Sequence, residues 1–459
     1  MTAPLDPHSS VQKTRALLLS AQQRYENRNP ESARLHQEAT QYLPGGNTRS
    51  VLHTSPFPIC MRKGHGNRLV DHDGHEYLDF LGEMTAGLYG HSHPKIREAI
   101  ISTTNEVGLN LGASTSAEVR LAKTICERVA SIEQVRFCNS GTEANLYALS
   151  VARQVTGLSK VIVFEGGYHG GLLYFGDGIA ANNVDKEDWI LGQYNDAEGA
   201  RRLIAEHKGT AAAVLVETMQ GSGGCIPGSA EFLHAVQDAA KENGLLFILD
   251  EVVTFRLAPG GLQSHILHHE NGGPLRPDLT TLGKSIAGGM TIGAFGGRRD
   301  LLAVYDPRKR QINHSGTFNN NSLAMNVGHV ALSSIYTPDA CVALNALGDE
   351  LRHGLQELAR GTKMVVIGVG AVLNFHFLPQ PDLESPALKV KDVRDVTVSP
   401  DSAEFLLKDL LWFHLLEHGI WIARRGMVSL MLDTTREDVE TFLQAVGGFL
   451  KEFEDLVRF

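Results

Sequence analysis

Short apolar runs alternate with longer mixed segments along the central part of the chain, from about Ile132 onward. Apolar runs bounded by turn residues are typical of strands buried on both faces of a sheet. The pattern predicts strands at Val135–Cys138, Lys160–Phe164, Ala211–Val216, Leu245–Leu249 and Ile292–Phe295, with helices such as Ala144–Gln154 and Ala230–Asn243 between them. Strands that alternate with helices predict an α/β fold with a parallel, doubly wound sheet.

The pattern changes after Thr337, and we expect residues 337–459 to form a smaller α+β domain. A Pro-rich polar loop from Leu378 to Pro400 interrupts this part of the chain. The pattern predicts a helix at Pro338–Ala359, strands near Val365–Phe377 and a helix at Ser402–His418, followed by a last strand and a last helix.

Residues 1–86 are expected to contribute to the same smaller domain. They read as a tail running into a polar helix, a second helix near Ser32–Tyr42, and strand-like pieces around Leu69–Phe80. A further helix is expected to begin after His93, because Pro94 suits a first helical turn. Residues 87–336 would then form the large domain.

The composition is that of a soluble globular protein that acts on small molecules. Of its 459 residues, 42% are hydrophobic and 20% are charged, which is enough for a large core and at least two domains. The formal net charge is −10 and no stripe of Lys and Arg is present, so we expect no nucleic-acid partner. A small metabolite is the expected partner.

The cysteines and the N-terminus predict a cytoplasmic protein. The five cysteines are widely separated and form no CxxC pair, as expected of reduced packing residues. Met1–Ser20 has no apolar segment of signal-peptide length. The sequence also contains no apolar run of about 18 residues, so we expect no membrane partner. His91 and His93 lack a third ligand at a useful spacing, so we expect a turn or capping role and no metal site.

Polar side chains follow several of the predicted strands. Because the carboxyl ends of parallel strands lie at one edge of a sheet, these side chains are expected to share a ligand site. The Ser140–Thr142 turn opens a helix, where free N–H groups and the helix dipole favour an anion such as phosphate. The other strand-end groups are Tyr168 in a glycine-rich loop, Glu217, Gln220, Asp250 beside Glu251, and Lys284.

Nucleotide cofactors fit this set poorly. Gly283-Lys284-Ser285 resembles the end of a Walker A loop, but Asp278 stands where the first glycine is required, and no GxGxxG follows a strand. Pyridoxal 5'-phosphate fits better, since it needs a lysine for covalent attachment, a carboxylate for the pyridine nitrogen, an anion site and an aromatic ring.

The chain resembles the class III, fold type I aminotransferases from about Arg34 to Phe449. The resemblance implies a large domain with a mostly parallel seven-stranded sheet, a smaller α+β domain, and pyridoxal phosphate as the cofactor. The motifs that carry it are PGGNTRS from Pro44, NSGTEAN from Asn139, GGYHGG from Gly166, ETMQG from Glu217, LDEVVT from Leu249, PDLTTLGKSIAGGM from Pro277 and HSGTFNNN from His314.

The resemblance assigns roles to residues of these motifs. It implies that Lys284 binds the cofactor and moves the proton at the reacting carbon, and that Asp250 pairs with the pyridine nitrogen. Tyr168 and Val252 would face the two sides of the ring. The remaining contacts implied are Gln220 near the ring hydroxyl with Glu217 behind it, Ser140, Gly141 and Thr142 at the phosphate, and Thr317 at the phosphate of the neighbouring subunit of a homodimer.

Two branches of the family compete. The glutamate-1-semialdehyde aminomutases, which move an amino group within one molecule, are the alternative; transaminases of aromatic β-amino acids share NTRSVL, LTTLGK and HSGTFNNN more closely. We therefore predict amino transfer from a β-amino acid to a keto acid such as 2-oxoglutarate. Arg49 and Arg425 match the two arginines that this branch uses for carboxylates, and Arg424 is an alternate candidate for the second. Met84 stands in the substrate wall where the β-phenylalanine enzymes usually carry an aromatic residue.

Overall fold

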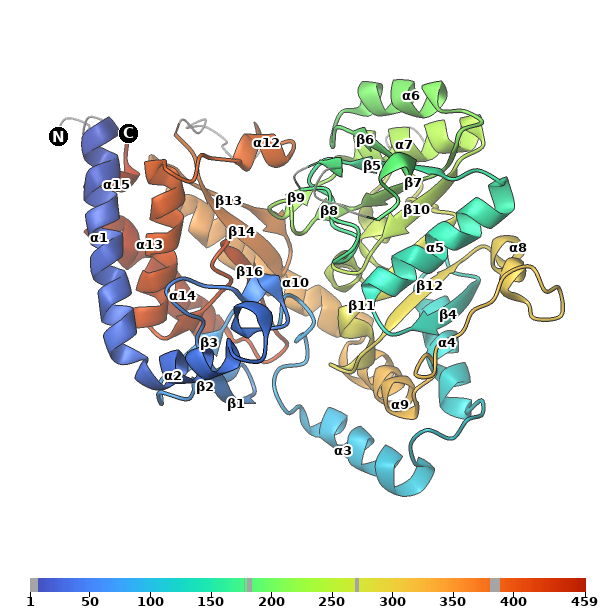
Figure 1. Ribbon diagram of the computed structural model, residues 1–459, viewed down its shortest axis with the longest axis horizontal. Coiled ribbons are helices and arrows are strands. Elements are labelled where there is room, and N and C mark those ends of the chain that lie inside the picture. The colour runs from blue at the N-terminus through green and yellow to red at the C-terminus, as the bar shows by residue number, and fades with distance from the viewer. Residues whose placement is uncertain (1–6, 177, 180–183, 269–271, 380–388) are drawn as a thin grey trace.

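A seven-stranded sheet forms the centre of the larger part of the molecule (Figure 1). The computed structural model describes residues 7–176, 178–179, 184–268, 272–379 and 389–459. In sheet order the strands are β4 (Gln134–Cys138), β12 (Gly293–Gly297), β11 (Leu279–Gly283), β10 (Leu246–Asp250), β7 (Ala211–Glu217), β5 (Lys160–Phe164) and β6 (Trp189–Gly192). Only β12 runs antiparallel to its neighbours, so the expected α/β fold with a mostly parallel sheet is confirmed.

Alternate residues of the strands face the two sides of this sheet, as the period of a strand requires. In β5, Val161 and Val163 pack toward α5 (Gly141–Thr156), whereas Ile162 and Phe164 pack toward α6 (Ala197–Glu206) and α7 (Ala230–Asn243). Figure 1 shows α6 above the strands and α5 across the opposite side. Because both faces are covered, the strands read as continuous apolar runs.

The hydrophobic pattern predicts five of these strands and misses β6 and β11. The bounds of the five predicted strands agree with the structure to within about two residues, as usual for element ends. The central threonines of β11 weaken its apolar signal, although they are completely buried. Helices α7 and α10 (Pro338–Ala359) have the expected bounds, and α13 (Ala403–Glu417) is one residue shorter at each end.

The smaller part joins the two ends of the chain. Strand β15 (Ile420–Trp421) pairs in parallel with β3 (Glu76–Asp79). Strand β3 pairs antiparallel with β2 (Arg68–Asp71), which pairs antiparallel with β1 (Met61–His65). A second sheet comprises β13 (Met364–Val369), β14 (Val372–Phe377) and β16 (Met427–Ser429). This pairing agrees with the expectation that residues 1–86 join the C-terminal domain, while the boundaries at 86 and 336 stay predictions.

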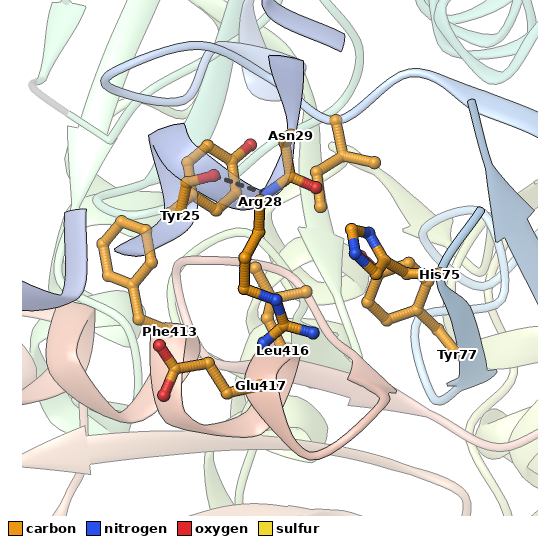
Figure 2. Close-up of a pocket in the computed structure, with 9 residues that line it drawn as sticks. Tyr25, Arg28, Asn29, His75, Tyr77, Phe413, Leu416 and Glu417 are labelled. Atoms are coloured by element: carbon orange, nitrogen blue, oxygen red, sulfur yellow. Dashed lines mark hydrogen bonds between the residues drawn. The ribbon is translucent and has the colours of Figure 1, made fainter. Parts of the chain in front are cut away.

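Helix α1 (Pro7–Arg28) attaches the N-terminus to this smaller part. It lies alongside α13 in Figure 1. Figure 2 shows Tyr25 of α1 near Phe413 of α13, and His75 and Tyr77 on the opposite side of the pocket. The Tyr25 and Phe413 rings meet edge to face at 5.4 Å, and the Tyr25 hydroxyl donates to the Phe57 carbonyl at 2.7 Å. The segment that reads as a tail and polar helix is therefore anchored in a packed core.

The remaining helices cover the sheets and connect the two parts. Of the expected loop from Leu378 to Pro400, residues 380–388 lie outside the described part of the chain. The other α-helices described are α2 (Pro30–Ala39), α3 (Pro94–Ser102), α4 (Ser116–Arg128), α8 (Arg299–Leu302), α9 (Ser322–Val330), α12 (Val393–Val396), α14 (Arg436–Glu452) and α15 (Glu454–Val457).

Among the described helices, none by itself has both the length and the apolar composition of a membrane span. One pair bent by 73°, Ser322–Ile335 and Pro338–Ala359, passes the same test when its two members are taken together.

Candidate active site

Asp250 is the last residue of β10, and its side chain is held on the α5 side of the sheet. Its Oδ1 accepts from the Val252 N–H at 2.9 Å. Its Oδ2 accepts from the Asn145 amide at 2.8 Å and lies 2.9 Å from His169 Nδ1. Asn145 in turn accepts from the Thr281 hydroxyl at 2.7 Å, so four segments fix one buried carboxylate.

The sequence did not single out Asn145 and His169, although both lie in motifs that carry the family resemblance. Both side chains are almost completely buried, and each holds the carboxylate of a residue far away in the chain. The signal that could have identified Asn145 is its place as a polar residue on the helix face whose other buried residues are apolar. For His169 the signal is its place beside Tyr168 at a strand end.

Glu251, the neighbouring acid, points elsewhere. Its carboxylate accepts from the Leu262 and Gln263 N–H groups at 3.1 and 2.7 Å and from the Thr254 hydroxyl at 2.7 Å. Burial raises the pKa of Glu251 to about 7. Glu251 therefore orders the chain between β10 and β11 and stands apart from the candidate site.

The Ser140–Thr142 turn opens helix α5 as expected. Ser140 is the N-cap, and its Oγ accepts from the Glu143 N–H at 3.1 Å. The N–H groups of Gly141 and Thr142, in the same first turn, have no intrahelical acceptor. A Cβ on Gly141 would lie 2.9 Å from both γ-carbons of Val252. The backbone of this turn thus lies directly against Val252, beside Asp250.

Lys284 follows β11 with its backbone in the left-handed region, at φ +51°. This conformation is strained for a residue with a side chain and is typical of functional positions. Burial lowers the pKa of Lys284; Asp250 and Glu217 raise it, and Arg425 and Arg49 lower it. The lysine is therefore within electrostatic reach of residues from both parts of the molecule.

Glu217 and Gln220 lie at the end of the neighbouring strand β7. Glu217 accepts from the Tyr168 N–H at 3.0 Å and the Gly221 N–H at 3.2 Å, and burial raises its pKa to about 7. Gln220 donates to the Glu165 carbonyl at 2.8 Å, whereas its Oε1 is buried with no hydrogen-bond partner among the described residues. This buried oxygen is free to accept a hydrogen bond from a ligand.

These features fit pyridoxal phosphate. Gln220 Oε1 can accept from a ring hydroxyl, the buried Asp250 carboxylate can hold a protonated ring nitrogen, and the open N-terminal turn of α5 can hold a phosphate. Tyr168, whose side chain is partly exposed at 37%, and Val252 lie beside the same strand ends. The structure brings Lys284, Asp250, Glu217 and Gln220 together at one sheet edge.

Arg49 and Met84 come from the N-terminal segment. Arg49 forms an ion pair with Glu83, which the sequence did not single out. Gly82, Glu83, Met84 and Thr85 all have positive φ angles, between +49° and +78°. Such a left-handed turn costs about 1–2 kcal/mol for each residue with a side chain, so strong contacts elsewhere must hold it.

The structure separates the two adjacent arginines. Arg424 forms a double hydrogen bond with Asp409, at 2.8 and 2.7 Å, and also donates to the Ser55 carbonyl. Arg425 has only long contacts, 3.4 Å to Ser222 Oγ and 3.6 Å to Met427 Sδ, and its buried Nε has no acceptor among the described residues. Of the two adjacent arginines, Arg425 is therefore the one whose guanidinium has no acid partner among the described residues.

Thr317 lies outside this cluster. Its loop packs near the start of α5 through a 2.9 Å hydrogen bond from the Asn139 amide to Asn319, but Thr317 is exposed. It lines a surface cavity of about 310 Å³ together with Leu111 and Phe318, whose side chains are also exposed.

The two histidines near α3 have separate roles. His91 Nε2 lies 2.9 Å from Asp79 Oδ2, and His93 occupies the N-cap position of α3 without a side-chain capping bond. In the described residues, no three His, Cys, Asp or Glu side chains are arranged to hold a metal ion.

The class of protein follows from the fold, this site and a family match. The model of the class-III aminotransferases matches residues 50–175 and 179–445. The chain belongs to this family, whose cofactor is pyridoxal 5'-phosphate, and its large domain has fold type I. The resemblance inferred from the motifs is confirmed.

Individual relatives narrow the comparison. A β-phenylalanine transaminase of Variovorax paradoxus is 45% identical over 94% of this chain and 95% of its own length. The crystal structure of a β-phenylalanine aminotransferase from that organism superposes with a TM-score of 0.90 at 43% identity, covering 97% of this chain and 99% of the other.

More distant relatives include an aminomutase and a further transaminase. A glutamate-1-semialdehyde 2,1-aminomutase of Acetivibrio thermocellus is 33% identical over 91% of this chain and 97% of its own. A solved transaminase with pyridoxal phosphate bound is 28% identical, with a TM-score of 0.79 over 93% of this chain and 98% of the other.

Proposed function

We propose that this aminotransferase moves an amino group between a β-amino acid, aromatic or related, and a keto acid such as 2-oxoglutarate. The observation that supports it best is an arginine, Arg425, that has no acid partner among the described residues and acts on the pKa of Lys284. The 45% identity to a β-phenylalanine transaminase supports the substrate class.

The roles of the chain's own residues follow from their surroundings. Bound pyridoxal phosphate supplies an electron sink for the substrate carbon that carries the amino group. Lys284 would hold the cofactor and then move the proton at that carbon, and burial lowers its pKa because it disfavours the charged amine. Asp250, oriented by Asn145 and His169, keeps the ring nitrogen protonated.

The other contacts follow the same reasoning. Gln220 Oε1 accepts from the ring hydroxyl, Ser140, Gly141 and Thr142 donate to the phosphate, and Tyr168 and Val252 enclose the ring. Each of these groups lies at the sheet edge that carries Asp250, and Gln220 Oε1 has no donor among the residues that the structure describes.

Two arginines give the enzyme two places for a carboxylate. In a β-amino acid the carboxylate is one carbon further from the reacting nitrogen than in an α-amino acid, so donor and acceptor place their carboxylates differently. Arg425 is ready to pair with one of them, while Arg49 exchanges Glu83 for a substrate carboxylate, with Met84 forming part of the wall. Because an aminomutase needs no keto-acid acceptor, two separate places for a carboxylate favour the transaminase function.

We also propose a homodimer whose subunits share their sites. The exposed Thr317, beside the exposed apolar side chains Leu111 and Phe318, supports this arrangement, because apolar side chains gathered at a polar loop mark an interface. Thr317 would then reach the phosphate held by the partner subunit. The cytoplasmic location expected from the sequence stays a prediction.

The proposal is tested with a panel of aromatic and aliphatic β-amino acids and 2-oxoglutarate. We expect glutamate to form, and the Lys284→Ala variant to lose both covalent cofactor and turnover while it stays folded. Lys284→Ala turnover equal to that of the unmodified enzyme would refute the role of the lysine. Rearrangement of glutamate semialdehyde without an acceptor, with β-amino acids inert, would establish the aminomutase function instead.

A further inference from the structure

Arg425 lines a cavity of about 600 Å³, most of whose other lining residues belong to the smaller part of the molecule. Met84 and Val51 line it from the N-terminal segment, and Lys408 of α13 lines it together with Arg425. The two acids that line it are already paired: Asp409 with Arg424 at 2.7 Å, and Glu404 with Lys363 at 2.9 Å. The cavity is therefore left with an excess of positive charge.

Lys408 and Arg425 make up this excess. Neither has an ion pair with a described acid, and Lys408 has no hydrogen-bond acceptor among the described residues. A Cβ on Gly426 would lie 3.3 Å from Lys408 Cε, so the lysine stem lies against the turn that carries Arg425. Two neighbouring cations repel each other, and such a pair is stabilised when an anion binds between them.

Arg425 connects this cavity to the reacting centre. Arg425 acts on the pKa of Lys284 and also on that of Lys408. Arg425 also lies 3.4 Å from Ser222 Oγ, two residues after Gln220, and it lines the cavity together with Lys408, so it links the strand-end loop of the candidate site to the cavity. A ligand that reacts at Lys284 and carries a second carboxylate can extend past Arg425 toward Lys408.

In a dicarboxylic keto acid, one carboxylate lies further from the reacting carbonyl than the other. We propose that Lys408 and Arg425 together bind this distal carboxylate. This inference rests on the proposed transaminase function. It makes Lys408 a specificity-determining residue that favours acceptors such as 2-oxoglutarate over monocarboxylic acceptors such as pyruvate.

The charge of Lys408 makes the preference depend on pH. Burial lowers the pKa of Lys408 to about 8; Arg425 lowers it too, while Cys225 and Asp409 act in the opposite direction. His376, which also lines the cavity, is neutral because burial holds its pKa well below the ordinary value. Lys408 is therefore charged at pH 7, and anion binding weakens as the pH rises through about 8.

The kinetic test compares two acceptors with one β-amino acid donor. We expect Lys408→Met to lower kcat/KM for 2-oxoglutarate by about tenfold or more, the scale of one lost charge-assisted contact, and to leave that for pyruvate unchanged. Lys408→Arg should keep the preference and remove its decline above about pH 8. Lys451→Met, which removes an exposed charge on α14, is the control and should behave as the unmodified enzyme.

A binding measurement needs no turnover. By calorimetry on the holoenzyme, glutarate should bind more tightly than butyrate, and Lys408→Met should abolish the difference. If no donor and acceptor are transaminated but this difference appears and depends on Lys408, the proposed function fails and the dicarboxylate site stands. Equal loss for both acceptors, or an unchanged preference in Lys408→Met, overturns the inference; should that variant not fold, the pH profile of Lys408→Arg decides.

Discussion

At the scale of single residues, the site is defined by which polar groups are paired inside the protein and which are not. Asp409 neutralises Arg424, and Glu251 is satisfied by three donors in its own loop. Gln220 Oε1 and Arg425 Nε remain buried without partners in the described part of the chain. A buried polar group without a partner costs free energy, and these two lie near Asp250 and Lys284, where a ligand could supply the missing hydrogen bonds.

The two adjacent arginines give the sharpest test at this scale. We expect Arg425→Gln to raise KM for a carboxylate substrate by about tenfold or more, because a charge-assisted contact is lost, with little effect on the free energy of unfolding. Arg424→Gln should instead lower the free energy of unfolding by about 1.5–3 kcal/mol, since it leaves Asp409 without its partner. Steady-state kinetics and chemical denaturation of both variants distinguish them, and the reverse pattern would move the anchor to Arg424.

At the scale of elements, strand ends and the start of one helix position the cofactor groups. Strands β7 and β10 end at Glu217 and Asp250, which are register partners, and β11 leads into Lys284. Helix α5 begins at Gly141, directly against Val252. The close approach of this helix to the chain after β10 leaves no room for a side chain at Gly141.

This close approach leads to a prediction about Gly141→Ala. A new Cβ at 2.9 Å from both Val252 γ-carbons must displace Val252 or the first turn of α5, so cofactor affinity should fall by about tenfold, the effect of roughly 1.4 kcal/mol. Gly171→Ala is the matched control, because a Cβ there would meet nothing within 4 Å. Titration of both apoenzymes with pyridoxal phosphate measures the effect, and equal affinities would show that the turn can move freely.

At the scale of the whole molecule, the site lies where the two parts meet. The seven-stranded sheet supplies the cofactor groups, whereas Arg49, Met84 and Arg425 come from the segments that build the smaller part. Helix α10 runs between the two parts in Figure 1. In the proposed function, substrate selection is thus separated from cofactor chemistry, which would allow one to change while the other is kept.

The proposed dimer is tested by mixing inactive subunits. Lys284→Ala and Thr317→Glu homodimers should each lose activity, the second because a carboxylate repels the phosphate. After random reassociation half of the dimers are mixed, each with one intact site of two, so activity should recover to about one quarter. A mixture of Lys284→Ala with Asp250→Ala should not recover, since neither mixed site is complete. No recovery in the first mixture would place Thr317 outside the partner's site.

The sequence by itself determined the fold class and the groups of the cofactor site. Both depend on local patterns: buried parallel strands read as apolar runs, and polar residues directly after such runs must gather at one sheet edge. Asp250, Lys284 and the Ser140–Thr142 turn could be found in this way. Strand β11 escaped the pattern, because two buried threonines look polar when the packing around them is unknown.

Only the tertiary structure decided which charges are free. Arg424 and Arg425 are neighbours in the sequence, yet one pairs with Asp409 of α13 and the other has no acid partner among the described residues. The contacts of Asn145 and His169 with Asp250 also join distant parts of the chain. The direction of a side chain and the pairing of a charge depend on such long-range contacts, and no local pattern of residue types encodes them.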